Sequence, residues 1–239
     1  MKVTILGCGE AFDDLLPNTS VLVEAAGRTI LCDCGYSVPR QLWSHGADPD
    51  AIYISHPHAD HYFGLPAVLG RMWDSGRERP LTVISQPAVL DQIKDILEYG
   101  YRGLAARFRF PIEWRAARAG EVDGIEWDFA ETMHSAPNLA VRMSAGGKTF
   151  CYSGDGMFTD RSRALFAGAD LLVHEAYFFD ESPVHADIGR LLEMAEAQGV
   201  RQLAMVHVQR GLRREPQRIL DAIAGRAVTM PESLAVYTL

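Results

Sequence analysis

The order of apolar and polar positions predicts a chain in which strands and helices alternate. Short runs rich in β-branched residues, such as residues 2–6 and 51–55, are typical of buried strands. Residues 88–99 instead repeat apolar positions at helical spacing. The strands gather at the start and middle of the chain, with helices between and after them. This order predicts an α/β fold of two packed sheets with helices on their outer faces, in a single domain over residues 1–239.

The same patterns give expected bounds for each element. Strands are expected at residues 2–6, 20–24, 28–33, 51–55, 81–85, 125–133, 139–144, 149–153, 171–174, 202–206 and 234–237. Helices are expected at residues 38–45, 64–74, 88–99, 160–166, 187–198 and 216–223, and residues 107–114 are expected to be extended. Gly46 should end one helix, and Gly146-Gly147 should turn a hairpin.

Candidate metal ligands concentrate just after one predicted buried strand, where residues 56–61 read HPHADH. His56 and His58 are two residues apart and point the same way in extended backbone, so both imidazoles can bind one metal ion. Asp60 and His61 lie beyond the bend and can reach a second ion. The alternative is a histidine-rich surface turn, which is disfavoured because the whole chain has only eight histidines.

Three further polar residues follow predicted strands: His134, Asp155 and His207. Each side chain would emerge at the end of a buried strand. Together with the histidine cluster they supply enough ligands for two divalent ions that share one carboxylate. Such a pair makes hydroxide available at neutral pH.

Composition narrows the classes of partner and compartment. The net charge of −8 disfavours a broad electrostatic grip on nucleic acid, which needs clustered Lys and Arg, so extended nucleic acid is an unexpected partner. No run approaches the roughly 18 apolar residues of a membrane span, and the first apolar run is too short for a signal peptide, so we expect a cytoplasmic protein. The four cysteines form no CxxC pair and are expected to be reduced structural thiols, with metal binding by Cys32 and Cys34 as the alternative.

The order of the candidate ligands resembles the signature of the metallo-β-lactamase superfamily, HxHxDH followed by His, Asp and His, over nearly the whole chain. The resemblance implies a metallo-β-lactamase-like domain, an αββα sandwich of two mixed sheets, with its site at one edge of the two sheets. Ala59 occupies the position where flavodiiron proteins carry a carboxylate, which favours two Zn²⁺ ions, with Mn²⁺ or iron as alternatives. The ligands implied are His56, His58 and His134 for the first ion, Asp60, His61 and His207 for the second, and Asp155 between them.

Other motifs resemble the ribonuclease Z and phosphodiesterase branch of that superfamily. Residues 31–35 (LCDCG) are similar to its LxDCG motif, and residues 174–176 (HEA) to its HEA motif. In that branch a histidine at the position of His185 protonates the leaving group; the alternative here is a helix-cap histidine. Short-type ribonuclease Z also has a long arm that grips transfer RNA, inserted between the residues that match His134 and Asp155. Only 21 positions separate 134 from 155 in this chain, so no arm fits.

These observations together predict a dinuclear zinc hydrolase that cleaves phosphodiester bonds with a metal-bridging hydroxide, and small or cyclic nucleotide substrates are favoured over transfer RNA. Asp60 is expected to help orient the nucleophile, His185 to protonate the leaving oxygen and Glu175 to orient a site histidine. One alternative is a hydrolase of a lactone, thioester or sulfate ester at the same metals. Another is a non-hydrolytic di-iron or metal-sensing protein. The resemblance also implies a homodimer.

Two residues outside the ligand set are candidate substrate contacts. Arg210, three residues after His207, offers a planar donor fork that matches phosphate oxygens, although the arginine run from 210 to 218 is also typical of a solvated face. Tyr177, the first of three consecutive aromatic residues, is a candidate wall for a base or ring. Its alternative is a core or dimer contact.

Overall fold

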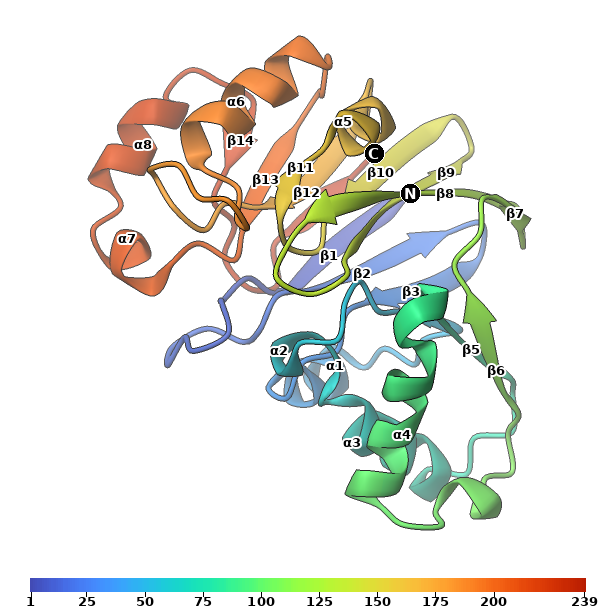
Figure 1. Cartoon of the computed structure of the whole chain (residues 1–239). Coiled ribbons are helices and arrows are strands. Elements are labelled where there is room, and N and C mark those ends of the chain that lie inside the picture. The colour runs from blue at the N-terminus through green and yellow to red at the C-terminus, as the bar shows by residue number, and fades with distance from the viewer.

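Two β-sheets pack face to face with helices on both outer faces (Figure 1) in the computed structural model, which describes all 239 residues. The N-terminal half contains β1 (Lys2–Gly7), β2 (Ser20–Ala25), β3 (Arg28–Cys32), α1 (Val38–His45), β4 (Ala51–Tyr53), α2 (Ala59–Tyr62), α3 (Leu65–Asp74), β5 (Leu81–Ser85), η1 (Pro87–Val89), α4 (Leu90–Gly100), η2 (Ala105–Arg107) and β6 (Ile112–Ala116). The C-terminal half contains β7 (Gly120–Val122), β8 (Ile125–Met133), β9 (Leu139–Ala145), β10 (Lys148–Tyr152), β11 (Met157–Phe158), α5 (Asp160–Phe166), β12 (Leu171–Glu175), α6 (Ile188–Ala197), β13 (Leu203–Val206), α7 (Arg210–Arg214), α8 (Gln217–Ile223), β14 (Val228–Thr229) and β15 (Val236–Thr238).

Both sheets are mixed, as the sequence predicted. The first has the order β15-β1-β2-β3-β4-β5-β6, antiparallel from β15 to β3 and parallel from β3 to β6. The second has the order β11-β8-β9-β10-β12-β13-β14, and β7 pairs with β8. Because β15 returns to pair with β1, the two chain ends lie close together (Figure 1). The expected αββα sandwich is confirmed.

Three apolar layers hold the sandwich together, one between the sheets and one under the helices on each outer face. The segment of β4 and the residue after it is apolar because its side chains are buried on both faces of the sheet. Tyr53 belongs to the layer between the sheets, while Ile52 and Ile54 point the other way into the layer under α1, α3 and α4. No helix is both long and apolar enough to cross a membrane, and the longest, α4, has 11 residues.

Most predicted elements are present, and the differences involve short segments. The helix predicted at residues 38–45 ends at Gly46, which has a left-handed φ of 77°. The sequence pattern missed α2 and α7, which have four and five residues and are too short for an apolar period. The segment expected to be extended at 107–114 starts with the end of η2 before β6 begins, and the closing strand is Val236–Thr238 rather than 234–237.

The interval between residues 134 and 155 is filled by the predicted hairpin. The strands β9 and β10 pair in antiparallel register and turn at Gly146 and Gly147, whose φ values of 58° and 73° suit glycine. A protruding arm has no place in this interval.

All four cysteines are unpaired and buried. Burial raises the pKa of the Cys151 thiol to about 12, and burial also raises the pKa of Cys8. We therefore expect the native protein to react very slowly with Ellman's reagent at mildly alkaline pH, and the protein unfolded in guanidinium chloride to show four thiols. A thiol that reacts at once in the native protein would contradict this expectation.

Candidate active site

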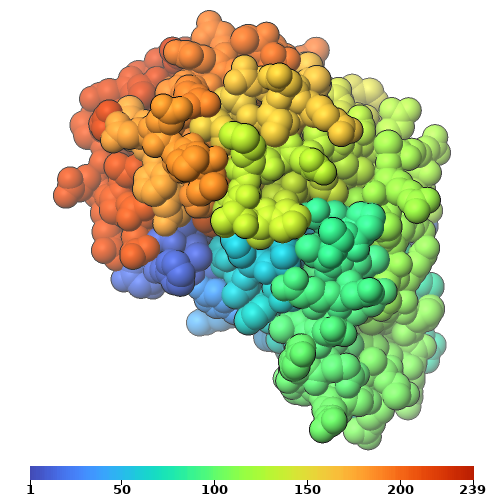
Figure 2. Space-filling model, in the orientation of Figure 1, coloured from blue at the N-terminus to red at the C-terminus, as the bar shows by residue number.

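The candidate ligands lie where strands of both sheets end, at the seam between the two halves of the chain. Figure 2 shows this seam on one face, where the blue-to-green N-terminal half meets the yellow-to-red C-terminal half. The loop after β4 carries His56 and His58, and α2 carries Asp60 and His61. The other three residues follow strands of the second sheet: His134 follows β8, Asp155 follows β10, and His207 follows β13. The structure thus brings all seven predicted residues together.

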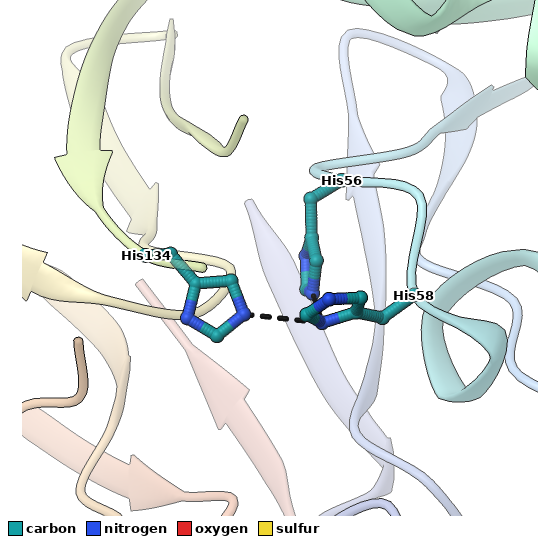
Figure 3. A group of neighbouring side chains, drawn as sticks. All are labelled: His56, His58 and His134. Atoms are coloured by element: carbon teal, nitrogen blue, oxygen red, sulfur yellow. Dashed lines mark hydrogen bonds between the residues drawn. The ribbon is translucent and has the colours of Figure 1, made fainter. Parts of the chain in front are cut away.

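The first cluster consists of three imidazoles that point toward one another (Figure 3). His56 Nε2 lies 3.0 Å from His58 Nδ1, and His134 Nε2 lies 3.1 Å from the same atom. Nitrogens that each bind one zinc ion at about 2.0–2.1 Å in a tetrahedron lie about 3.3 Å apart. The spacing of the three nitrogens therefore fits a shared metal ion.

The second cluster contains two carboxylates and two imidazoles, all buried. Asp60 Oδ2 lies 3.2 Å from both His61 Nε2 and His207 Nε2. Asp155 Oδ2 lies 3.5 Å from His61 Nε2 and 3.4 Å from His207 Nε2. It also lies 3.8 Å from His56 Nε2 and 3.9 Å from His134 Nε2, so this one oxygen faces both clusters.

Unpartnered buried atoms in the second cluster show that the site fits a cation. His61 Nε2 and Asp155 Oδ1 are fully enclosed and have no hydrogen-bond partner. A buried polar atom without a partner costs about 1–3 kcal/mol, so native proteins rarely leave one. A divalent ion bound among these ligands would satisfy His61 Nε2, and the whole set of seven, with five imidazoles and two carboxylates, is typical of zinc.

The surroundings set the charge of each ligand. Burial, followed by the neighbouring imidazoles, lowers the pKa of His56 and of His58 below the ordinary value, so both are neutral and free to bind a cation. Burial would raise the pKa of the Asp155 carboxyl, but His207 and His61 outweigh it and lower that pKa below its ordinary range. The site therefore presents the neutral imidazoles of His56 and His58 in the first cluster and an ionised carboxylate, Asp155, that faces both clusters.

A buried carboxylate, Asp33, supports the second cluster from behind. It lies 2.7 Å from His61 Nδ1 and accepts hydrogen bonds from Ser55 Oγ at 2.7 Å and Tyr152 Oη at 2.6 Å. Its φ of 61° is left-handed, a conformation that Asp tolerates better than most residues. Asp33 thus fixes the orientation of the His61 ring. The last residue of the same motif, Gly35, allows close packing, since an added Cβ would lie 1.9 Å from the backbone oxygen of Asp60.

Glu175 and His185 form a pair beside the clusters. His185 Nδ1 lies 2.9 Å from Glu175 Oε2, and Glu175 Oε1 accepts hydrogen bonds from the backbone N–H groups of Gly156 and Ala186. Burial lowers the pKa of His185, but the hydrogen bond to Glu175 and its charge outweigh burial and raise that pKa above the ordinary value. Nitrogen and oxygen atoms of His134, Asp155 and His185 lie within 4.8 Å of one another, so the imidazole reaches the edge of the metal site.

The two candidate substrate residues have well-defined surroundings. Arg210 Nη1 donates a hydrogen bond of 2.5 Å to the fully buried Glu10. The other arginines of the run also have acidic partners, so the run is charge-compensated: Arg213 with Glu232, Arg214 with Asp14, and Arg218 with Asp180. The Tyr177 ring stacks on the His185 imidazole rather than on the core.

Sequence reasoning missed two residues that support the site. Asn138 donates hydrogen bonds to Thr132 Oγ1 and to the Ser153 carbonyl oxygen, and its own Oδ1 accepts from the N–H of Asp155. Glu10 anchors Arg210 from the loop after β1. Both lie in loops without periodicity, and only their tertiary partners identify them. Cys32 and Cys34 belong to none of the candidate metal clusters.

Comparison with known proteins places the chain in a family. Residues 1–219 match the sequence profile of a family described as Anti-Pycsar protein Apyc1. Ribonuclease Z of Natronomonas pharaonis is 26% identical, over 95% of this chain and 94% of the relative. Ribonuclease Z of Methanothermobacter thermautotrophicus is also 26% identical, over 93% and 91%.

Solved structures of the same fold cover nearly the whole chain. The metallo-β-lactamase fold protein YhfI of Bacillus subtilis superposes with a TM-score of 0.82 at 21% identity, covering 99% of this chain and 98% of YhfI. The short form of human tRNase Z superposes with a TM-score of 0.80 at 22% identity, covering 100% of this chain and 99% of the tRNase Z chain.

The alignment with the Natronomonas pharaonis relative spans 294 positions, whereas this chain has 239 residues. Within the aligned region, that relative therefore contains residues that have no counterpart in this chain. Sequence, fold and ligand cluster agree: the chain is a metal-dependent hydrolase of the metallo-β-lactamase superfamily and belongs to the family of the anti-Pycsar protein Apyc1.

Proposed function

We propose that the chain, acting as one hydrolase domain, cleaves phosphodiester bonds in small nucleotide-type substrates, with cyclic nucleotides favoured over transfer RNA. The observation that carries the proposal is the shared position of Asp155, whose Oδ2 faces both ligand clusters while His185 lies at their edge. Two bound divalent ions, zinc by preference, would supply a hydroxide nucleophile at neutral pH and offset the charge that develops on the phosphoryl oxygens.

The protein's own residues hold and orient the reacting groups. His56, His58 and His134 would bind one ion, Asp60, His61 and His207 the other, and Asp155 both. The Val184 carbonyl oxygen accepts a hydrogen bond of 2.9 Å from His134 Nδ1, which turns Nε2 toward the site. Asp33, at 2.7 Å from His61 Nδ1, orients the His61 ring in the same way, with Nε2 toward the site. Asp60 Oδ2, which lies between two imidazoles, is placed to orient the nucleophile.

His185 is the proposed proton donor. Since Nδ1 donates its hydrogen bond to Glu175, Nε2 is the atom that faces the site and delivers the proton to the leaving oxygen. Glu175 acts through His185 by fixing its tautomer, and its buried carboxylate is fully hydrogen-bonded. The helix-cap reading of His185 has no support, because α6 is capped by the side chain of Asp187.

Three features favour a small substrate. The interval between His134 and Asp155 holds only the β9–β10 hairpin, the arginines after His207 have acidic partners, and the chain carries a net charge of −8. The curated relatives are named ribonuclease Z, which supports a phosphodiester as the bond that is cleaved. The metal clusters alone would equally serve a lactone, thioester or sulfate ester, so the substrate class needs a direct test.

The test is a substrate panel with metal-quantified protein: bis(p-nitrophenyl) phosphate, 3′,5′-cyclic nucleotides, p-nitrophenyl acetate, a lactone, a thioester and p-nitrophenyl sulfate. We expect turnover of the phosphodiesters only. His185→Gln should lower kcat for a cyclic nucleotide by about a hundredfold, because its sugar-oxygen leaving group needs a proton. His45→Gln, at an exposed histidine at the end of α1, is the matched control and should leave kcat unchanged. Turnover of the carboxylic or sulfate esters alone would overturn the proposal and leave the fold and the ligand clusters intact.

A further inference from the structure

Tyr177 lies just beyond the end of β12, two residues after Glu175. The N–H of Ala176 donates to the Val206 carbonyl oxygen at 3.0 Å, and the N–H of Gln209 donates to the Tyr177 carbonyl oxygen at 3.1 Å. These bonds tie the segment to the chain on both sides of His207. Because residues two apart in extended backbone project to the same side, Glu175 and Tyr177 both reach one imidazole, that of His185.

The tyrosine ring covers one face of that imidazole. The ring centroids of Tyr177 and His185 are 4.5 Å apart and their planes differ by 22°, which is a stacked arrangement. Two other rings form T-shaped pairs with the imidazole, His134 with a centroid distance of 5.0 Å and Phe178 with one of 6.0 Å. His185 is therefore bounded by a hydrogen bond at Nδ1, by a stacked ring on one face and by two rings steeply inclined to its plane.

The hydrogen bond and the stacked ring restrict different motions of His185. A hydrogen bond to Nδ1 fixes one atom of the ring but allows the rest of the ring to swing about that atom. A stacked aromatic ring blocks the swing out of the plane, because the imidazole would have to leave its contact face. Proton transfer needs the donor atom within about 0.5 Å and 10–20° of its productive position, so the second restraint affects the rate directly.

We propose that Tyr177 is a positioning residue that holds the imidazole of His185 with Nε2 toward the leaving oxygen. The inference rests on the proposed function and replaces the expectation that Tyr177 forms a wall for the substrate base. In the step concerned, the bond from phosphorus to the leaving oxygen breaks as a bond from hydroxide oxygen to phosphorus forms. The leaving oxygen keeps the electron pair of the broken bond and takes the proton from Nε2, which leaves a neutral imidazole.

Two diesters that differ in leaving group separate positioning from substrate binding. Diphenyl phosphate releases phenolate, a much poorer leaving group than the p-nitrophenolate of bis(p-nitrophenyl) phosphate, so it depends more on a proton donor. We expect Tyr177→Leu to lower kcat for diphenyl phosphate by about tenfold or more, with kcat for the nitrophenyl diester within about threefold and both KM values unchanged. Tyr177→Phe keeps the ring face and should match the unmodified protein on both substrates.

A double variant tests whether Tyr177 acts through His185. Combining Tyr177→Leu with His185→Gln should slow diphenyl phosphate hydrolysis no more than His185→Gln does alone. Thermal unfolding of each variant checks that the fold is retained. An equal rise in KM for both diesters, or additive effects in the double variant, would overturn the positioning role in favour of direct substrate contact.

A measurement without turnover keeps this inference separable from the proposed function. In the zinc-loaded protein, the ring current of the stacked tyrosine should shift the NMR signal of the His185 Cε1 proton upfield. Tyr177→Leu should move this signal downfield, and Tyr177→Phe should not. If the unmodified protein cleaves neither diester, the proposed function fails while the spectrum still tests the stacking. If the signal is the same in Tyr177→Leu, the positioning role fails whatever the activity.

Discussion

Replacing Asp155 by Asn is expected to lower kcat/KM for a phosphodiester by at least about a thousandfold. Asn has the same shape and keeps one oxygen, but it removes the negative charge from the atom that lies 3.4–3.9 Å from four imidazole nitrogens of both clusters. The loss of shared charge should also lower the metal content per chain. Metal-assisted charge stabilisation contributes several kcal/mol, and each 1.4 kcal/mol or so is tenfold in rate.

The measurement combines kinetics with metal analysis by mass spectrometry. Asp128→Asn is the matched control, because Asp128 is an exposed residue on β8, the strand that ends one residue before His134. It should retain both activity and metal. Asp155→Asn protein that keeps more than a tenth of the activity would show that this carboxylate does not join the two clusters.

The second large effect is expected at Asp33, which is not one of the seven predicted ligands but contacts one of them, His61. Asp33→Asn keeps a side chain that tolerates the left-handed φ of 61°, so the backbone is unstrained. It removes the charge that His61, Ser55 and Tyr152 share and places an amide N–H₂ among groups that donate. We expect metal affinity to fall by about 10–100-fold, as is typical when a partner of a metal-binding histidine is lost. Stability should fall by about 2 kcal/mol or more.

Chelator competition measures the loss of metal affinity in Asp33→Asn, and urea unfolding of the metal-free protein measures the loss of stability. Tyr152→Phe is the graded comparison, since it removes one hydrogen bond to Asp33 and leaves the carboxylate in place. It should show a smaller loss in both measurements. An unchanged metal affinity in Asp33→Asn would mean that packing alone holds the His61 ring.

The residues predicted from the sequence are those whose placement depends on local pattern. The sandwich could be predicted from runs such as β4, whose two faces are both buried. Six of the seven candidate ligands lie just past predicted strands or in one short motif that follows such a strand. The seventh, Asp155, is separated from a predicted strand by one glycine. Their grouping into two clusters follows from where those strands end at a common edge.

The residues that could not be predicted depend on contacts between distant segments. Nothing in the local sequence distinguishes Glu10 from other acidic loop residues, because its partner, Arg210, lies 200 positions away in the chain. Tyr177 has the same apolar character whether it lines a pocket, packs in the core or stacks on His185, and only the ring geometry reveals the stacking on His185. Short elements such as α7 are fixed by a cap from Gln209 rather than by an apolar period.

The division of the ligands between the two sheets has a consequence for folding kinetics. The loop after β4 and α2 supply four ligands from the first sheet, and the second sheet supplies the other three. Neither half can therefore present a full coordination shell before the sheets have docked, so high-affinity metal capture must be a late event in folding. Metal bound by ligands from both sheets would link the sheets across the seam. Separating the sheets would then require breaking metal bonds, which should slow unfolding while leaving the early rate of chain collapse unchanged.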